Sequence, residues 1–70
     1  MTFAGKVKYV RMKLYLSQAQ LAKEIGVSFA TVNRWENKGY EPQLASLGRF
    51  NDFCEKHGIT FDDKGDMNNG

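Results

Sequence analysis

The side chains best suited to recognise another molecule lie in the segment FATVNRWEN at residues 29–37. At about 100° per residue in a helix, Val32 and Trp35 share one face and would point toward a core. The opposite face and its edges carry four candidates for contacts with DNA bases, which are Phe29, Ala30, Asn33 and Arg34. An arginine can donate two hydrogen bonds to guanine O6 and N7, and an asparagine can form two hydrogen bonds with adenine N6 and N7. Apolar groups can contact thymine methyls. The alternative is an ordinary solvated face. The aromatic ring in the first turn argues against that alternative, unless the ring packs on a neighbouring loop.

A second group of polar residues is suited to the phosphate backbone. The amino-terminal end of a helix presents free N–H groups and the positive end of the helix dipole, and both attract phosphate. Ser17 and Gln18 fall at one such start, and Ser28 falls at the next. The expected phosphate contacts are Ser17, Gln18, Ser28, Thr31, Asn37, Lys38 and Tyr40. For the two serines helix capping is the alternative role, and both roles can coexist.

Other chemistry finds little support in these 70 residues. Cys54 and His57 are spaced i, i+3, but they are the only cysteine and the only histidine, and two ligands do not make a tetrahedral metal site. Cys54 is better explained as a core thiol and His57 as a cation at a helix end. No nucleophile–base pair and no calcium-type loop is present, and so small a chain has little room for a substrate cleft. We therefore expect no enzyme activity, no metal, no cofactor and no small-molecule ligand.

The helices that would position these side chains have clear start and stop signals. The apolar spacing of Val7, Val10 and Leu14 predicts a first helix over about residues 4–14. Ser17 and Gln20 have the spacing of a capping box, so a second helix should run from residue 18 to about residue 25. Its end is predicted by a glycine at position 26, a residue that accepts the left-handed conformation of a helix end.

The same signals recur further along the chain. Ser28 predicts the start of a third helix over about residues 29–37, ended by Lys38 and a following glycine. Pro42 is expected in the first turn of a fourth helix, where its missing N–H costs nothing. An apolar face on that helix, running to about residue 57, would comprise Leu44, Leu47, Phe50, Phe53 and Cys54. Ile59 and Phe61 should fold back onto the core.

Two short helices joined by a three-residue turn form a helix-turn-helix, predicted here at about residues 17–37. Ala22 is the small residue that such a crossing needs, and Gly26 is the turn glycine. Leu21, Ile25 and Val27 fill the apolar positions of the first part of the motif. The fold class predicted is all-α, a compact repressor-like bundle of four to five helices. Residues 1–60 would form one domain and residues 61–70 a flexible polar tail.

The segment LSQAQLAKEIGVSFATVNRWEN at residues 16–37 closely resembles the phage repressor/Cro family, also called XRE-like. The resemblance implies sequence-specific binding to double-stranded DNA with the third helix in the major groove, most simply by a transcriptional regulator. It also implies a structural pair between Arg11 and Glu36 that holds this helix against the scaffold. Family members commonly dimerise on palindromic sites, so a homodimer is a further possibility.

Charge is distributed unevenly along the chain. Residues 1–40 carry seven basic and two acidic side chains, whereas residues 41–70 carry three basic and six acidic ones. A basic first half suits a protein that turns one face to a polyanion, although a chance imbalance would give the same numbers. No apolar stretch approaches the length of a membrane span or a signal peptide, and one cysteine cannot form an internal disulfide. The expected location is the cytoplasm of a prokaryote, at the nucleoid.

Two other functions remain open from the sequence. The domain could be the DNA-targeting module of a larger DNA-modification or helicase protein. It could also be a protein-interaction adaptor that kept the fold without DNA binding. An adaptor should carry acidic residues or an apolar stripe on the third helix, and the presence of Asn33, Arg34 and Asn37 there favours DNA.

Overall fold

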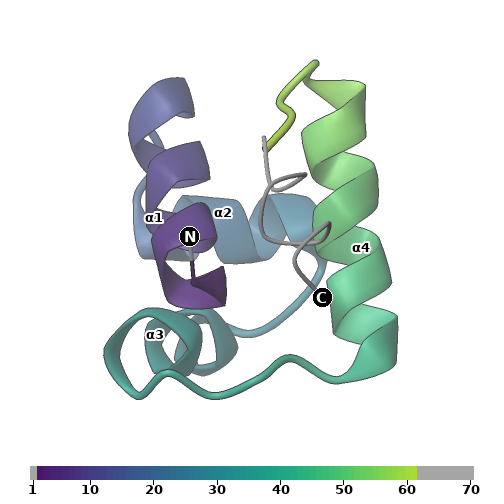
Figure 1. Cartoon of the computed structure of the whole chain (residues 1–70). Coiled ribbons are helices and arrows are strands. Elements are labelled where there is room, and N and C mark those ends of the chain that lie inside the picture. Colours follow the sequence, from purple (N-terminus) through teal and green to yellow (C-terminus); the bar gives the residue numbers. More distant parts are fainter. Residues whose placement is uncertain (1, 62–70) are drawn as a thin grey trace.

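The computed structural model describes residues 2–61, which form four α-helices and, within that range, no strand. Helix α1 spans Phe3–Leu14, α2 spans Gln18–Ile25, α3 spans Phe29–Asn37 and α4 spans Leu44–Lys56. In Figure 1, α1 and α4 stand on either side of α2, and α3 lies across the lower end of the molecule. The predicted all-α fold class is confirmed, with four helices rather than five in the described range. Of the polar tail expected at residues 61–70, residues 62–70 lie outside the described residues.

The two helices of the helix-turn-helix begin and end where their caps predict. Ser17 Oγ accepts from the N–H of Gln20 at 3.0 Å, and the Gln20 side chain accepts from the N–H of Ser17 at 2.8 Å. Gly26 ends α2 with a φ of 90°. Ser28 caps α3 by accepting from the N–H of Thr31 at 3.1 Å. The capping box and both helix ranges are therefore confirmed.

Helix α1 begins one residue before its predicted start and ends at Leu14, as predicted. It begins at Phe3, because Thr2 accepts a hydrogen bond from the N–H of Gly5 at 3.0 Å and caps the helix. Its C-cap is Tyr15, which adopts a left-handed conformation with a φ of 57° although it is not glycine. The Tyr15 side chain is 92% exposed, so no packing around the ring explains this conformation.

The start of α4 was predicted wrongly. Pro42 precedes the helix instead of lying in its first turn, because Gln43 is the N-cap and Leu44 is the first helical residue. The proline restricts φ to a value that also suits extended chain, and here it belongs to the connection from α3. Leu44 is 84% exposed and is not part of the apolar face.

The core is one cluster to which all four helices contribute. Val7 and Val10 of α1, Leu21 of α2, Val32 of α3 and Phe50 of α4 are almost completely buried. Packing of apolar side chains from every helix fixes the angle at which α3 leaves the bundle.

Aromatic rings and the end of the described chain close this core. Trp35 is 3% exposed, and the ring of Phe3 meets it edge-on at 5.1 Å between centroids. Ile59 is buried and Phe61 packs against the core with its ring 5.7 Å from that of Tyr9, which confirms that both fold back. The expected domain boundary had placed Phe61 in the tail.

Candidate nucleic-acid interface

The outer face of α3 is open to solvent. Phe29 is 54% exposed, and Ala30, Arg34 and Asn37 are exposed as well. Phe29 makes no ring–ring contact among the described residues, and more than half of its surface is open to solvent. Because Val32 and Trp35 anchor the opposite side in the core, the exposed face has a defined orientation.

Asn33 differs from the other candidates on this helix because it is half-buried. Its Nδ2 donates to Oε1 of Gln18, at the start of α2, at 3.0 Å. Gln18 in turn donates its Nε2 to Oε1 of Glu36 at 3.1 Å. Asn33 therefore lies on the edge of α3 that faces α2, and its amide is held by a side chain of the neighbouring helix.

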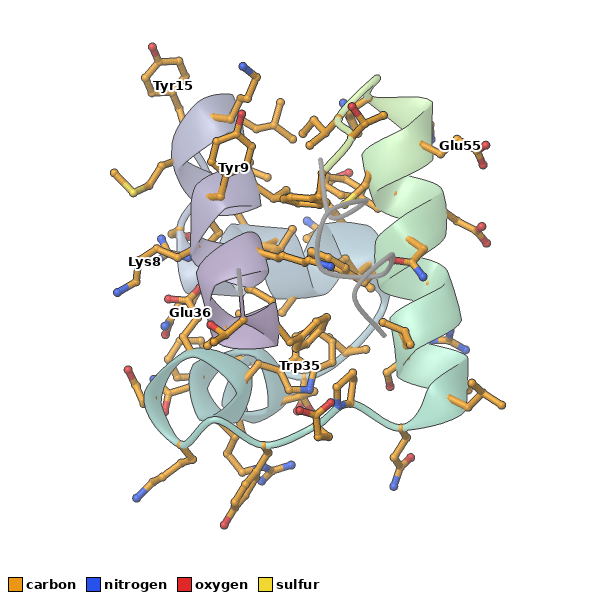
Figure 2. The ribbon with its side chains drawn as sticks, in the orientation of Figure 1. Lys8, Tyr9, Tyr15, Trp35, Glu36 and Glu55 are labelled. Carbon is orange, nitrogen blue, oxygen red and sulfur yellow. The ribbon has the colours of Figure 1, made fainter. Side chains whose placement is uncertain are left out.

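Glu36 and Arg11 form a two-point ion pair between α3 and α1. Arg11 Nε lies 2.6 Å from Glu36 Oε2, and Arg11 Nη2 lies 2.8 Å from Glu36 Oε1. Arg11 Nη1 also donates to the carbonyl oxygen of Leu16 at 3.1 Å, which ties the loop before α2 to the same group. Figure 2 shows Glu36 directed toward α1. The role of this pair in holding α3 against the scaffold stays a prediction.

The ion pair changes the protonation equilibria of both partners. Burial raises the pKa of Glu36, but hydrogen bonds from Arg11 and Gln18 and the charges of Arg11 and Lys8 outweigh burial and leave this pKa below its ordinary value. The hydrogen bond to Glu36 raises the pKa of Arg11. With a side chain only 2% exposed, the carboxylate depends on these donors to remain charged.

The start of α2 provides one set of free backbone donors on the α3 side of the molecule. The capping box uses the N–H groups of Ser17 and Gln20, and the N–H groups of Gln18 and Ala19 have no partner within the helix. The Ser17 hydroxyl caps the helix, and the Gln18 side chain bonds Glu36 and Asn33. The backbone N–H groups of Gln18 and Ala19 are therefore the donors left for an anion.

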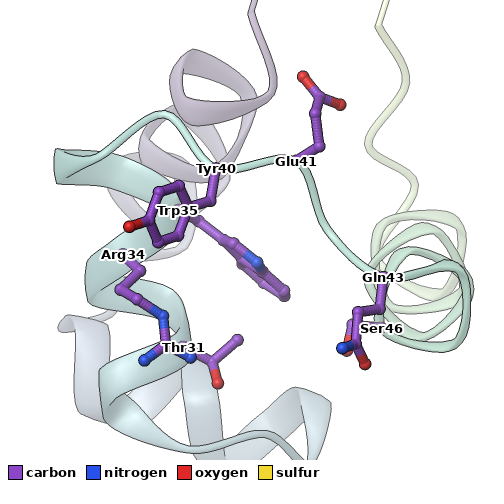
Figure 3. Close-up of a pocket in the computed structure, with 7 residues that line it drawn as sticks. All are labelled: Thr31, Arg34, Trp35, Tyr40, Glu41, Gln43 and Ser46. Carbon is purple, nitrogen blue, oxygen red and sulfur yellow. The ribbon is translucent and has the colours of Figure 1, made fainter.

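A hollow of about 400 Å³ lies on the other side of α3, between α3 and the start of α4 (Figure 3). It brings together three predicted site residues, Thr31, Arg34 and Tyr40. The remaining lining residues are Trp35, Glu41, Gln43 and Ser46. No side chain caps the start of α4, so its first N–H groups lie beside this hollow without a capping partner.

Gln43 and Ser46 were missed by the sequence analysis because the start of α4 was assigned too early. With Gln43 as the N-cap, Ser46 is the third residue of the helix that follows α3. The other predicted phosphate residues are spread more widely. Asn37 and Lys38 are exposed at the end of α3, and Ser28 is exposed at its start.

No metal site is formed by the described residues, in which no group of three or more His, Cys, Asp or Glu side chains gathers. Cys54 is buried, and burial raises the pKa of its thiol, partly offset by the charge of Lys6. The ring of His57 packs against Phe53 with centroids 4.4 Å apart. In residues 2–61, no helix has the length and apolar character needed to cross a membrane.

The fold and the exposed third helix together define a helix-turn-helix domain. A family model described as helix-turn-helix matches residues 7–60 of the chain. The chain belongs to this family, of the repressor/Cro (XRE) type, and the family is a DNA-binding rather than an enzymatic one. Searches of curated proteins and of solved structures gave no match.

Proposed function

We propose that this protein binds specific sequences of double-stranded DNA as a transcriptional regulator, with α3 in the major groove. The observation that carries the proposal is the open face of α3, where Phe29, Ala30 and Arg34 are exposed while the opposite side is anchored in the core. The major groove of B-DNA admits one α-helix, and only there do base edges differ for all four base pairs.

The base contacts follow from the positions of these side chains. Arg34 would bind guanine O6 and N7 through its two-pronged guanidinium group, and Asn33 would bind adenine from the edge nearest α2. Phe29 and Ala30, in the first turn of α3, would contact thymine methyls. The 54% exposure of the Phe29 ring in the free protein supports this role, because burial against a base would remove apolar surface from water.

Phosphate contacts on both sides of α3 would fix its position in the groove. The N–H groups at the start of α2 would bind one phosphate, beside Ser17 and Gln18. Thr31 and Tyr40 line the hollow at the start of α4, and this hollow would hold a phosphate across the groove. The full proposed set remains Ser17, Gln18, Ser28, Thr31, Asn37, Lys38 and Tyr40.

The excess of basic over acidic residues in the first forty positions, seven against two, supports association with DNA. We place the protein in a prokaryotic cytoplasm, at the nucleoid, and a homodimer on a palindromic site is compatible with this function.

Selection of bound sequences from random duplex DNA tests the proposal. One enriched motif is expected, and affinity for it should fall with salt, with a slope in log–log form of about −0.9 for each phosphate contacted. Failure to enrich any motif, or an affinity that does not change between low and moderate salt, would contradict it.

A further inference from the structure

A chain of hydrogen bonds runs from α1 to the edge of α3 that faces α2. Arg11 donates to Glu36, Gln18 donates to Glu36 at 3.1 Å, and Asn33 donates to Gln18 at 3.0 Å. We call these four residues the amide relay. Arg11 lies on α1, outside the proposed DNA-binding face, whereas Asn33 is a candidate for a base contact.

The charged Arg11–Glu36 pair sets the direction of every hydrogen bond in the amide relay. An ionised carboxylate can only accept hydrogen bonds, so Gln18 must turn its NH₂ group toward Glu36. Its oxygen then points to α3, and Asn33 must turn its own NH₂ group toward that oxygen. With either amide reversed, two acceptors or two donors would face each other.

This arrangement determines what Asn33 offers to a base. One of the two hydrogens on Nδ2 is used by Gln18, and no described residue donates a hydrogen bond to Oδ1. The groups that remain are one N–H donor and one carbonyl acceptor. Adenine presents N7 as an acceptor and N6 as a donor in the major groove, and this pair matches the remaining groups of an asparagine.

We infer that the amide relay makes Asn33 specific for adenine, and that Glu36 and Gln18 act as positioning residues for this base contact. The inference depends on the proposed function, since it explains the base preference of one residue of the proposed interface. A free asparagine could turn its amide over and exchange the places of its donor and its acceptor. Held by the relay, it presents one orientation only.

Site selection with variants tests the relay. Asn33→Ala should remove the preference for adenine at one position of the enriched motif and identify that position. Gln18→Met breaks the relay but keeps the Arg11–Glu36 pair and the free backbone N–H groups of α2. We expect it to lower the adenine preference at the same position by about 5-fold or more, within the range of one bidentate contact, and to leave the other positions unchanged.

A second variant tests whether the Glu36 carboxylate sets the direction of these hydrogen bonds. Glu36→Gln replaces an obligate acceptor with a group that can also donate, so both directions of the relay become possible. The same position should lose its preference, whereas Glu24→Gln, an equal loss of charge at an exposed site on α2, should retain the wild-type motif. An unchanged adenine preference in folded Gln18→Met or Glu36→Gln would overturn the inference.

Wild-type protein provides a test that does not depend on variant folding. Replacing the identified adenine with purine, which lacks the N6 amino group, should weaken binding by about 5- to 150-fold. Equal binding to both duplexes, or a guanine or cytosine at the position erased by Asn33→Ala, would overturn the adenine assignment. Either of these two results would refute the adenine assignment while DNA binding remained. A wild-type protein that enriches no motif would refute the proposed function itself.

Discussion

Arg49 donates its Nη1 to the carbonyl oxygen of Gly26 at 2.8 Å and thereby joins α4 to the turn between α2 and α3. Gly26 has a φ of 90°, and a Cβ added there would lie 3.2 Å from Arg49 Nη1. The turn therefore needs glycine for its backbone conformation and also for the approach of the arginine. The crossing of α2 and α3 is stabilised from α4 as well as by their own packing.

The first prediction concerns this turn. Gly26→Ala should lower the free energy of unfolding by about 1–2 kcal/mol, the cost of a left-handed conformation for a residue with a Cβ. Urea denaturation followed by circular dichroism measures the change. Gly48→Ala is the matched control, because Gly48 lies inside α4 with open space around its Cα. That control should raise stability by about 0.5–1 kcal/mol, and a loss in both variants would contradict the argument.

The second prediction concerns the Arg11–Glu36 pair. Arg11→Ala leaves a carboxylate of 2% exposure without its main partner and should cost about 3 kcal/mol of stability. Glu36→Ala should also destabilise, and the double variant should lose less than the sum of the two, because it leaves no unpaired charge. Thermal or urea unfolding of all four proteins gives the coupling energy. Strict additivity would mean that the two side chains do not interact.

The third prediction is a pH dependence that originates at Glu36. The pKa of Glu36 in the folded protein is lowered from the ordinary value of 4.5, so the unfolded chain binds this proton more readily than the folded one. The stability contributed by the carboxylate is therefore fully present above pH 4.5 and is lost as the pH falls through the lower pKa of the folded state.

Urea midpoints measured from pH 6 down to pH 3 check this dependence. The wild type should lose more stability over the acidic part of that range than Glu36→Gln does, because the variant has no carboxylate to protonate at this position. Parallel curves for the two proteins would show that Glu36 titrates alike in the folded and unfolded states.

The fourth prediction concerns Arg34, which is exposed on α3. If this side chain binds a guanine, Arg34→Ala should cost about 1–3 kcal/mol of binding free energy and relax the preference at one base pair, with the other positions retained. Selected-site profiles of wild type and variant measure the effect. Uniformly weaker binding with a salt slope reduced by about one would instead assign the arginine to a phosphate in the hollow beside α4.

The helix-turn-helix could be predicted to the residue because its signals are local. Ser17 with Gln20, Gly26, and Ser28 each determine a helix end through contacts within a few positions of the chain. Where a local signal is ambiguous, prediction failed. Pro42 suits extended chain as well as a first helical turn, and the start of α4 was therefore predicted wrongly.

The candidate site was predictable in its composition but not in its contacts. Periodicity placed Arg34 and Asn33 away from the core, yet it could not show that Asn33 donates to Gln18, fifteen positions earlier. That contact depends on the angle between α2 and α3, which the packing of the whole core determines. The hollow that gathers Arg34, Tyr40 and Gln43 likewise requires the path of the connection to α4.

The edge-on contacts of Phe3 affect how a recombinant fragment of this protein should be cut. Its ring lies 5.1 Å from that of Trp35 and 5.2 Å from that of Phe50, whereas the family match begins at residue 7. A fragment trimmed to the matched residues would lose this ring and expose one side of the only tryptophan in the chain. The emission maximum of Trp35 is thus a built-in spectroscopic reporter, and it should move to longer wavelength when the first turn of α1 is removed.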